Sequence, residues 1–178
     1  MAEEIGTPFY CYSQATFTRH IEVMMGAFAG TDTLVAYAMK ANSNQAMLAI
    51  AAKQGIGADV VSVGELERAL RAGIPADKII FSGVAKSRAE MRRGLDVGIL
   101  CFNVESEPEL ERLNAVAAEM DKIAPVSVRI NPDVDAKTHA KISTGKSENK
   151  FGIPFGRAEA VYARIAACKN LKAVGVDM

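Results

Sequence analysis

The sequence has no excess of charge of either sign, because 21 lysine and arginine residues are matched by 21 aspartate and glutamate residues among 178. A neutral chain lacks the long-range field that draws proteins to nucleic acid or to an anionic membrane. No local basic patch with interleaved aromatic residues compensates for this. We therefore expect one ordinary soluble globular domain with no nucleic-acid partner.

Long apolar runs are also missing, since no window approaches the roughly 20 apolar residues of a membrane-spanning helix. The opening stretch MAEEIGTPF is acidic and lacks the basic and then apolar segments of a signal peptide. These absences predict a cytoplasmic protein with no membrane partner.

Cysteine is scarce, with Cys11, Cys101 and Cys168 far apart and no CxxC pair among them. Neither histidine has a cysteine or carboxylate nearby at the spacing of metal ligands. This pattern argues against a disulfide framework and against a zinc site. We expect reduced, mostly buried thiols and no bound metal.

Six short apolar or β-branched runs predict buried strands separated by helices. The runs are residues 33–37, 59–61, 79–81, 99–102, 125–130 and 171–176. Three of the helices are preceded by the serine-to-glutamate spacing of a capping box. The pairs are Ser62 with Glu65, Ser87 with Glu90 and Ser106 with Glu109. Strand, turn and helix in this order predict parallel βαβ units, hence an open sheet or a barrel.

Two apolar stripes at helical spacing predict helix faces that lie in the core. One stripe consists of Phe17, Ile21, Met24, Met25 and Phe28, and the other of Leu110, Leu113, Ala117 and Met120.

The spacing of the units indicates how much of a barrel the chain could form, and an open doubly wound sheet remains the alternative. Four strand-to-strand steps lie between Val35 and Val126, so a unit takes about 23 residues, whereas an eight-unit barrel typically takes about 250. The expected fold class is α/β. Residues 1–178 would form one domain, a partial (β/α)8 TIM-type barrel of about six parallel strands that is truncated before closure.

One long irregular segment covers residues 131–155, and a loop of that length in a compact domain is usually functional. Gly145–Ser147 resembles the end of a phosphate-binding P-loop, but Ala140 stands where the first glycine is required. Asp133 and Asp135 lack the remaining ligands of a calcium loop. The basic residues of the segment are Lys137, His139, Lys141, Lys146 and Lys150. They form either a solvated face or a site for a phosphate or carboxylate.

Lys40 directly follows the apolar run 34–39, at the carboxyl end of the first predicted strand, where parallel sheets and barrels place their active sites. We expect its amine to emerge from an apolar wall, where desolvation favours the neutral form that attacks aldehydes. Arg129 and Asp59 lie near the ends of two other strands and could bind an anionic cofactor beside it. From the residues alone, a solvated strand end, a structural ion-pair network and, for Glu65, a helix cap remain the alternatives.

Four segments resemble the pyridoxal-phosphate-dependent decarboxylases that have an alanine-racemase-like barrel. YAMKAN at 37–42 is similar to their lysine motif, GADVVSVGEL at 57–66 to the next block, and GTPFYCYS at 6–13 to their opening. RINPDVDAKTHAKISTGKSENKFGIP at 129–154 resembles most closely the members that act on meso-2,6-diaminopimelate.

The resemblance implies a lyase that removes CO2 from meso-2,6-diaminopimelate to give L-lysine, a step of lysine biosynthesis. Lys40 would hold pyridoxal 5'-phosphate covalently and assist proton transfers. Arg129 would sit beside the cofactor ring, and Asp59 and Glu65 would line the lysine side of the pocket. The family also implies a homodimer, with Lys150–Gly152 near its interface.

The sequence differs from the members of this family in its length. Family members are considerably longer, and their remaining motifs and their C-terminal β-domain are not found here. We therefore expect little activity from these residues alone. A non-catalytic or regulatory relative, or another amino-acid decarboxylase or racemase on the same barrel, remains an alternative.

Overall fold

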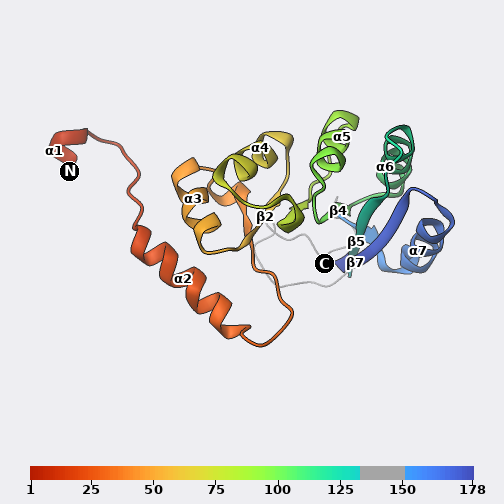
Figure 1. Ribbon diagram of the computed structural model, residues 1–178, viewed down its shortest axis with the longest axis horizontal. Helices are drawn as coiled ribbons and strands as arrows, with labels where there is room; N and C mark the ends of the chain where they lie inside the picture. The colour runs from red at the N-terminus through yellow and green to blue at the C-terminus, as the bar shows by residue number, and fades with distance from the viewer. Residues whose placement is uncertain (133–150) are drawn as a thin grey trace.

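The computed structural model describes residues 1–132 and 151–178, which form a curved parallel sheet with helices along one side (Figure 1). The aspartates and basic residues singled out between positions 133 and 150 lie outside the described residues.

The described strands form one parallel sheet. They are β1 (Ala36–Ala38), β2 (Gly57–Val60), β3 (Ile79–Phe81), β4 (Cys101–Val104), β5 (Ala124–Asn131), β6 (Ile153–Pro154) and β7 (Leu171–Asp177). The first five pair in chain order, and β5 then pairs with both β6 and β7. This order excludes a doubly wound sheet, in which the strand order reverses. Within the described chain β1 and β7 have no second neighbour, so the predicted partial, unclosed barrel is confirmed.

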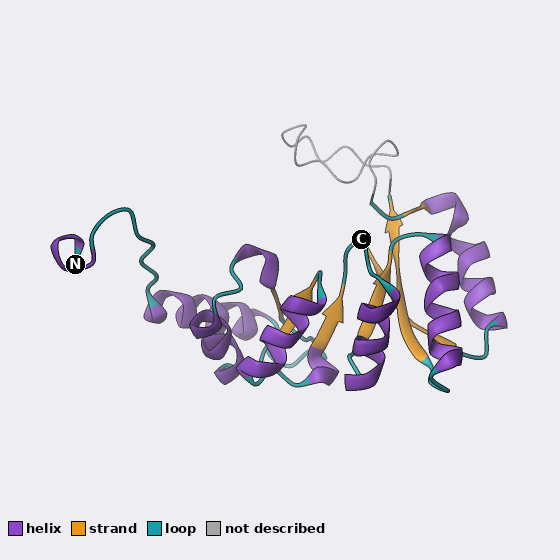
Figure 2. Ribbon diagram, turned by 90° about the horizontal axis from the view of Figure 1, so that it is seen from above, coloured by secondary structure: helices purple, strands orange, loops and turns teal. Residues whose placement is uncertain are grey.

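Two helices precede the first strand, and the others lie between successive strands. They are α1 (Ala2–Ile5), α2 (Gln14–Ala27), α3 (Gln45–Lys53), α4 (Val63–Ala72), α5 (Arg88–Val97), α6 (Glu107–Glu119) and α7 (Ala158–Ala167), with 3-10 turns η1 (Met39–Ala41), η2 (Ala76–Lys78) and η3 (Phe155–Arg157). Figure 2 shows the strand arrows running in one direction between them. In the described part of the chain, no helix has the length and apolar character needed to cross a bilayer.

The predicted caps begin their helices as expected. The side-chain oxygens of Ser62, Ser87 and Ser106 accept hydrogen bonds from the amides of Glu65, Glu90 and Glu109, each at 3.3 Å. Only at Ser87 does the glutamate also return to the cap residue's own amide and complete a capping box. The carboxylates of Glu65 and Glu109 instead reach one residue further, to the amides of Val61 and Glu105, at 2.7 and 3.0 Å.

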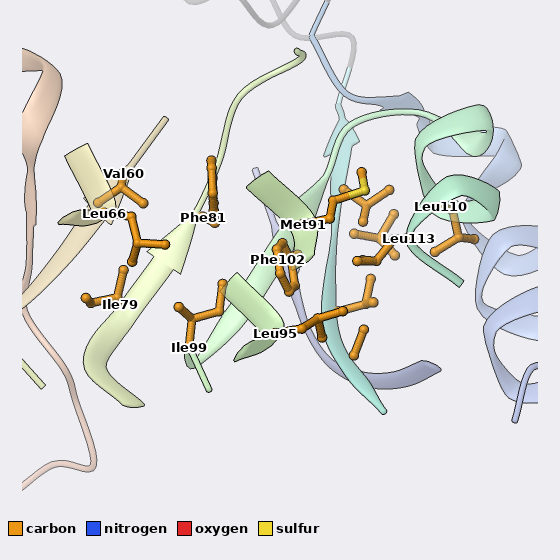
Figure 3. Packing of buried hydrophobic residues seen from close by; sticks show 14 of the residues in the cluster. Val60, Leu66, Ile79, Phe81, Met91, Leu95, Ile99, Phe102, Leu110 and Leu113 are labelled. Carbon is orange, nitrogen blue, oxygen red and sulfur yellow. The ribbon is translucent and has the colours of Figure 1, made fainter. Parts of the chain in front are cut away.

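The main core lies between the sheet and its helices (Figure 3). Alternate strand residues point into it, including Ile79 and Phe81 of β3 and Phe102 of β4, which meet Leu66 and Met91 of the helices. The rings of Phe81 and Phe102 are fully buried and stack with centroids 6.1 Å apart. Burial of each ring contributes roughly 1.5–3 kcal/mol to stability. The strand residues that alternate with these point to the opposite face of the sheet.

One predicted core stripe is confirmed and the other is largely wrong. On α6, Leu110, Leu113 and Ala117 are buried and Met120 packs against the core from its end. On α2, however, Ile21 is buried in a small cluster with Ala51 and Ile56, while the far end of the stripe is open. Met24, Met25 and Phe28 are 50%, 40% and 42% exposed. Helical spacing identifies an apolar face, but not whether a neighbour reaches it.

A methyl group at Gly94 tests the packing of α5 on the sheet. A Cβ at this position would lie 2.7 Å from Cζ of the Phe102 ring and 3.2 Å from Cδ1 of Ile99. Because that ring is buried and cannot swing away, we expect Gly94→Ala to lower the free energy of unfolding by about 1–3 kcal/mol, measured by urea denaturation.

The matched control is Gly26→Ala in α2, where no described heavy atom lies within 4 Å of the new methyl group. A helical glycine replaced by alanine in open space should raise stability by roughly 0.5–1 kcal/mol. Equal effects of the two substitutions would contradict the packing described for Phe102.

Candidate active site

Lys40 lies where the first strand ends. It belongs to η1, two residues beyond Ala38, whose Cα pairs with that of Asp59. Its side chain is exposed, and within residues 1–132 and 151–178 its Nζ has no hydrogen-bond or ion-pair partner. The apolar wall expected around this amine is therefore not observed. The reason is local, because the chain turns into η1 after Ala38 and brings Met39 into the core instead.

The residues around Lys40 hold the turn in place. The Tyr37 hydroxyl donates to the carbonyl oxygen of Asn42 at 3.2 Å, and Oδ1 of Asn42 accepts from the amide of Asn44 at 2.9 Å. Burial, with a smaller effect of Tyr12, raises the pKa of Tyr37, so this hydroxyl keeps its proton. The Nδ2 of Asn42 is buried without a partner in the described chain. A buried donor left unpaired is costly and suits a site that another group completes.

Asp59 starts a chain of polar contacts along the inner face of the sheet, the face that the helices do not cover. Its Oδ1 accepts from the Ser82 hydroxyl at 2.5 Å, and the Ser82 oxygen accepts from Nδ2 of Asn103 at 3.1 Å. Beyond Asn103, Sγ of Cys101 lies 3.9 Å from Oδ1 of Asn103. The sequence reasoning missed Ser82 and Asn103, although each directly follows a predicted strand, just as Asp59 lies near the end of its own strand, β2.

Arg129 lies on the same face between two carboxylates. Its Nη1 donates to Oε1 and Oε2 of Glu105 at 3.3 and 3.2 Å, and its Nε lies 3.7 Å from Oδ2 of Asp177. Its guanidinium carbon lies 5.2 Å from the centroid of the Phe151 ring. Burial raises the pKa of Asp177; Arg129 opposes this, and Glu105 and Asp59 add to it.

Glu105 and Asp177 are site residues that the sequence reasoning also missed. The signal for Asp177 is the strand register, because its Cα pairs directly with that of Arg129. Glu105 follows Val104, which pairs with Val128, the residue before Arg129. Neither signal can be read before the strands are paired.

Glu65 lies in the first turn of α4, and its side chain reaches back to the loop after β2. Its carboxylate accepts from the Val61 amide at 2.7 Å, which is the helix-cap role left open by the sequence. Glu90 performs a similar task between two loops, accepting from the amides of Val63 and Ser87 at 3.0 and 2.9 Å. Burial opposes ionisation of Glu90, but these hydrogen bonds hold its pKa below the ordinary value. Both carboxylates therefore stiffen the edge of the sheet.

The inner face also encloses a hollow of about 300 Å³, lined by residues that include Cys101, Asn103, Ser127, Val176 and Asp177. Near it, the described residues hold no group of three or more histidine, cysteine or acidic side chains that could bind a metal ion.

The edge of the sheet around Lys40 suits the aldehyde end of pyridoxal phosphate better than its phosphate end. Lys40 offers an unpaired, accessible amine to an aldehyde. The charged side chains of the site are the cations Lys40 and Arg129 and the carboxylates of Asp59, Glu105 and Asp177. These five provide no surplus of positive charge for a phosphate dianion. The residues thus fit the aldehyde end of the cofactor.

A parallel barrel wall with a free lysine beyond its first strand defines the class of α/β-barrel enzymes that bind ligands at the carboxyl ends of their strands. Within this class, the family described as "Pyridoxal-dependent decarboxylase, pyridoxal binding domain" matches residues 14–178. The chain belongs to this family of pyridoxal-dependent decarboxylases, and pyridoxal phosphate is the cofactor that the matched domain binds.

Similar proteins include the diaminopimelate decarboxylases of Pseudomonas aeruginosa and Vibrio cholerae, which are 55% and 54% identical over 177 residues. The match covers 99% of this chain but 43% and 42% of theirs. Among solved structures, Helicobacter pylori diaminopimelate decarboxylase complexed with L-lysine is 42% identical, with a TM-score of 0.95 over 98% of this chain and 44% of that one. The chain therefore spans less than half the length of these relatives.

The thiols test the description of the inner face. Cys101 is buried, as expected, but Cys11 is exposed, which corrects the expectation of mostly buried thiols. Burial, with smaller effects of Asp177 and Asp59, raises the pKa of Cys101 to about 11. Since the thiolate is the reactive form, we expect iodoacetamide at pH 8 to modify Cys11 at least tenfold faster than Cys101.

Peptide mapping by mass spectrometry measures the two rates, and unfolding in urea provides the control, because it should make them similar. Comparable rates in the folded chain would show that Cys101 is not shielded on the inner face.

Proposed function

We propose that this chain is the pyridoxal-binding part of an enzyme that decarboxylates meso-2,6-diaminopimelate to L-lysine and CO2. The observation that carries the proposal is the free amine of Lys40 at the strand end, in a chain 55% identical to a diaminopimelate decarboxylase. The L-lysine bound to the similar Helicobacter pylori enzyme has the structure of the proposed product.

In this proposal Lys40 holds the cofactor through its aldehyde carbon. The bound cofactor supplies an electron sink, which stabilises the electron pair left when a carboxylate departs as CO2. When it is not bonded to the cofactor, the Lys40 amine could take up or deliver a proton. Among the described residues Nζ has no ion-pair partner, and this supports the role, because no described carboxylate has to be released first.

The other site residues shape the surroundings of the amine. Arg129 would lie beside the cofactor ring, and its contacts with Glu105 and Asp177 would keep it from folding over the site. Asp59, oriented by Ser82, lines the lysine side of the pocket. Glu65 lines the same side through the loop that its carboxylate braces at Val61.

The proposal includes a homodimer, a cytoplasmic location and a single partial-barrel domain over residues 1–178. It also includes low activity of these residues alone. That expectation is supported by the charge of the site, where three carboxylates outnumber the cations Lys40 and Arg129.

Borohydride reduction tests the assignment of Lys40. We expect the chain incubated with pyridoxal phosphate and reduced with borohydride to carry the label on the peptide containing Lys40, because its amine is exposed and unpaired. Lys40→Ala should lose at least nine tenths of the specific label, measured by peptide mapping.

The control is Lys53→Ala, which removes another exposed lysine at the far end of α3. It should label as the unsubstituted chain does. Retention of specific labelling in Lys40→Ala would reject Lys40 as the cofactor lysine.

Release of CO2 tests the substrate. With pyridoxal phosphate present, we expect slow release from meso-2,6-diaminopimelate above the Lys40→Ala blank, and none above that blank from L-ornithine or L-arginine. Faster release from L-ornithine would point to another decarboxylase of the family. No release from any of the three would leave a pyridoxal-binding domain without this activity.

A further inference from the structure

Lys86 is the one buried lysine in the part of the chain that the structure describes, with 3% of the residue exposed. Its Nζ donates to the carbonyl oxygen of Gly83 at 2.6 Å, to that of Asn103 at 2.7 Å and to Oε1 of Glu109 at 2.8 Å. It also lies 5.9 Å from the centroid of the Phe81 ring. An ammonium group has three N–H bonds, and all three are occupied here.

Lys86 differs from Lys40 in that all three of its N–H bonds have acceptors. Burial in a cleft is the usual reason to suspect a lysine of covalent chemistry. Lys86 is buried, yet each of its three N–H bonds points to an acceptor and its ammonium is ion-paired with Glu109. Lys86 is therefore built to hold other groups rather than to react.

The groups that Lys86 holds lie on both sides of Glu105. Glu109, its ion-pair partner, accepts the Glu105 amide through Oε2 at 3.0 Å. Gly83, whose carbonyl Lys86 binds, donates its own amide to Oε1 of Glu105 at 2.8 Å. The Glu105 side chain, 1% exposed, then receives the guanidinium of Arg129. A continuous set of contacts thus runs from Lys86 to Arg129 on the inner face of the sheet.

We propose that Lys86 is a positioning residue, which fixes the Glu105 carboxylate through Glu109 and Gly83 and thereby fixes Arg129 on the inner face of the sheet. The contacts join the loop after β3, at Gly83, to Glu105 after β4, which in turn contacts Arg129. The ligand readout below rests on the proposed function, whereas the exchange readout does not.

Lys86→Met is the first variant, because it keeps the length of the side chain and removes the three donors. Leaving Glu109 unpaired in the interior should open the two loops, since an uncompensated buried charge is strongly unfavourable. We expect amide hydrogen exchange at Gly83 and Glu105, measured by NMR, to accelerate at least tenfold more than exchange in the middle of α7. The exchange of the Nε proton of Arg129 should accelerate with them.

The matched control is Lys122→Met. Lys122 is also partly buried and donates to a backbone carbonyl, that of Leu95 at 2.8 Å, but it has no contact with Glu105 or Arg129. We expect it to leave the exchange of Gly83 and Glu105 unchanged relative to α7. If Lys86→Met accelerates all amides by one common factor, its role is general stability and the proposal is wrong.

Glu109→Gln covers the case in which Lys86→Met does not fold. Glutamine can still accept from Lys86 through its carbonyl oxygen, but its amide nitrogen cannot accept from the backbone of Glu105. We expect faster exchange at the Glu105 amide, with a smaller change at Gly83. Unchanged exchange at Glu105 in this variant would overturn the proposal.

Pyridoxal phosphate is the ligand probe. If Arg129 is positioned through Lys86, Lys86→Met should raise the dissociation constant at least fivefold, measured by fluorescence, and Lys122→Met should change it less than twofold. If the dissociation constant is unchanged while exchange at Glu105 is faster, Lys86 positions only the two loops. That result would overturn its proposed role in cofactor binding. If the unsubstituted chain binds no pyridoxal phosphate, the proposed function fails, and the exchange data still decide the role of Lys86.

Discussion

Parallel pairing in chain order is the constraint on which the functional edge depends. Because α3 to α7 each return the chain to the same end of the sheet, the paired strands run in the same direction and end at the same edge. Register then selects which residues meet there. Ala38 pairs with Asp59, and Arg129 pairs with Asp177, so groups far apart in the chain share one wall. A slip of one residue would turn each of these side chains toward the helices.

The functional edge of the sheet is built largely from charged side chains that are shielded from solvent. The pair of Lys86 and Glu109 and the pair of Glu105 and Arg129 lie within one network joined by backbone amides. Such pairs add little net stability, because desolvation offsets their attraction, but removal of one partner is expensive. Their consequence is geometric, since each charge stays where its partner and amide donors hold it. Lys40 differs from all of them in being exposed and unpaired within the described chain.

The sheet and its helices are shared with known enzymes. A TM-score of 0.95 with 42% identity shows that the Helicobacter pylori enzyme shares this arrangement of strands and helices almost completely. The inner face of the frame carries a polar chain from Asp59 to Cys101 and the hollow beside Ser127, while the outer face is apolar and sealed. That asymmetry is what a barrel wall requires, because helices cover its outer face, its inner face lines the barrel, and ligands bind at the carboxyl ends of the strands.

Much of the frame was readable from residue pattern, because strand runs, helix caps and the Lys40 motif are local signals. The failures were also physical: spacing could not show that Met24 and Met25 of α2 are exposed, that Ile153–Pro154 forms a short strand, or that Met39 takes the buried place beside Lys40. Glu105, Asp177 and Lys86 had no local signal, since their roles come from partners on other elements. The sequence by itself determined the alternation of strands and helices and the lysine that follows the first strand. Only the tertiary structure decided which charges are buried and paired, because pairing depends on the register between strands that are distant along the chain.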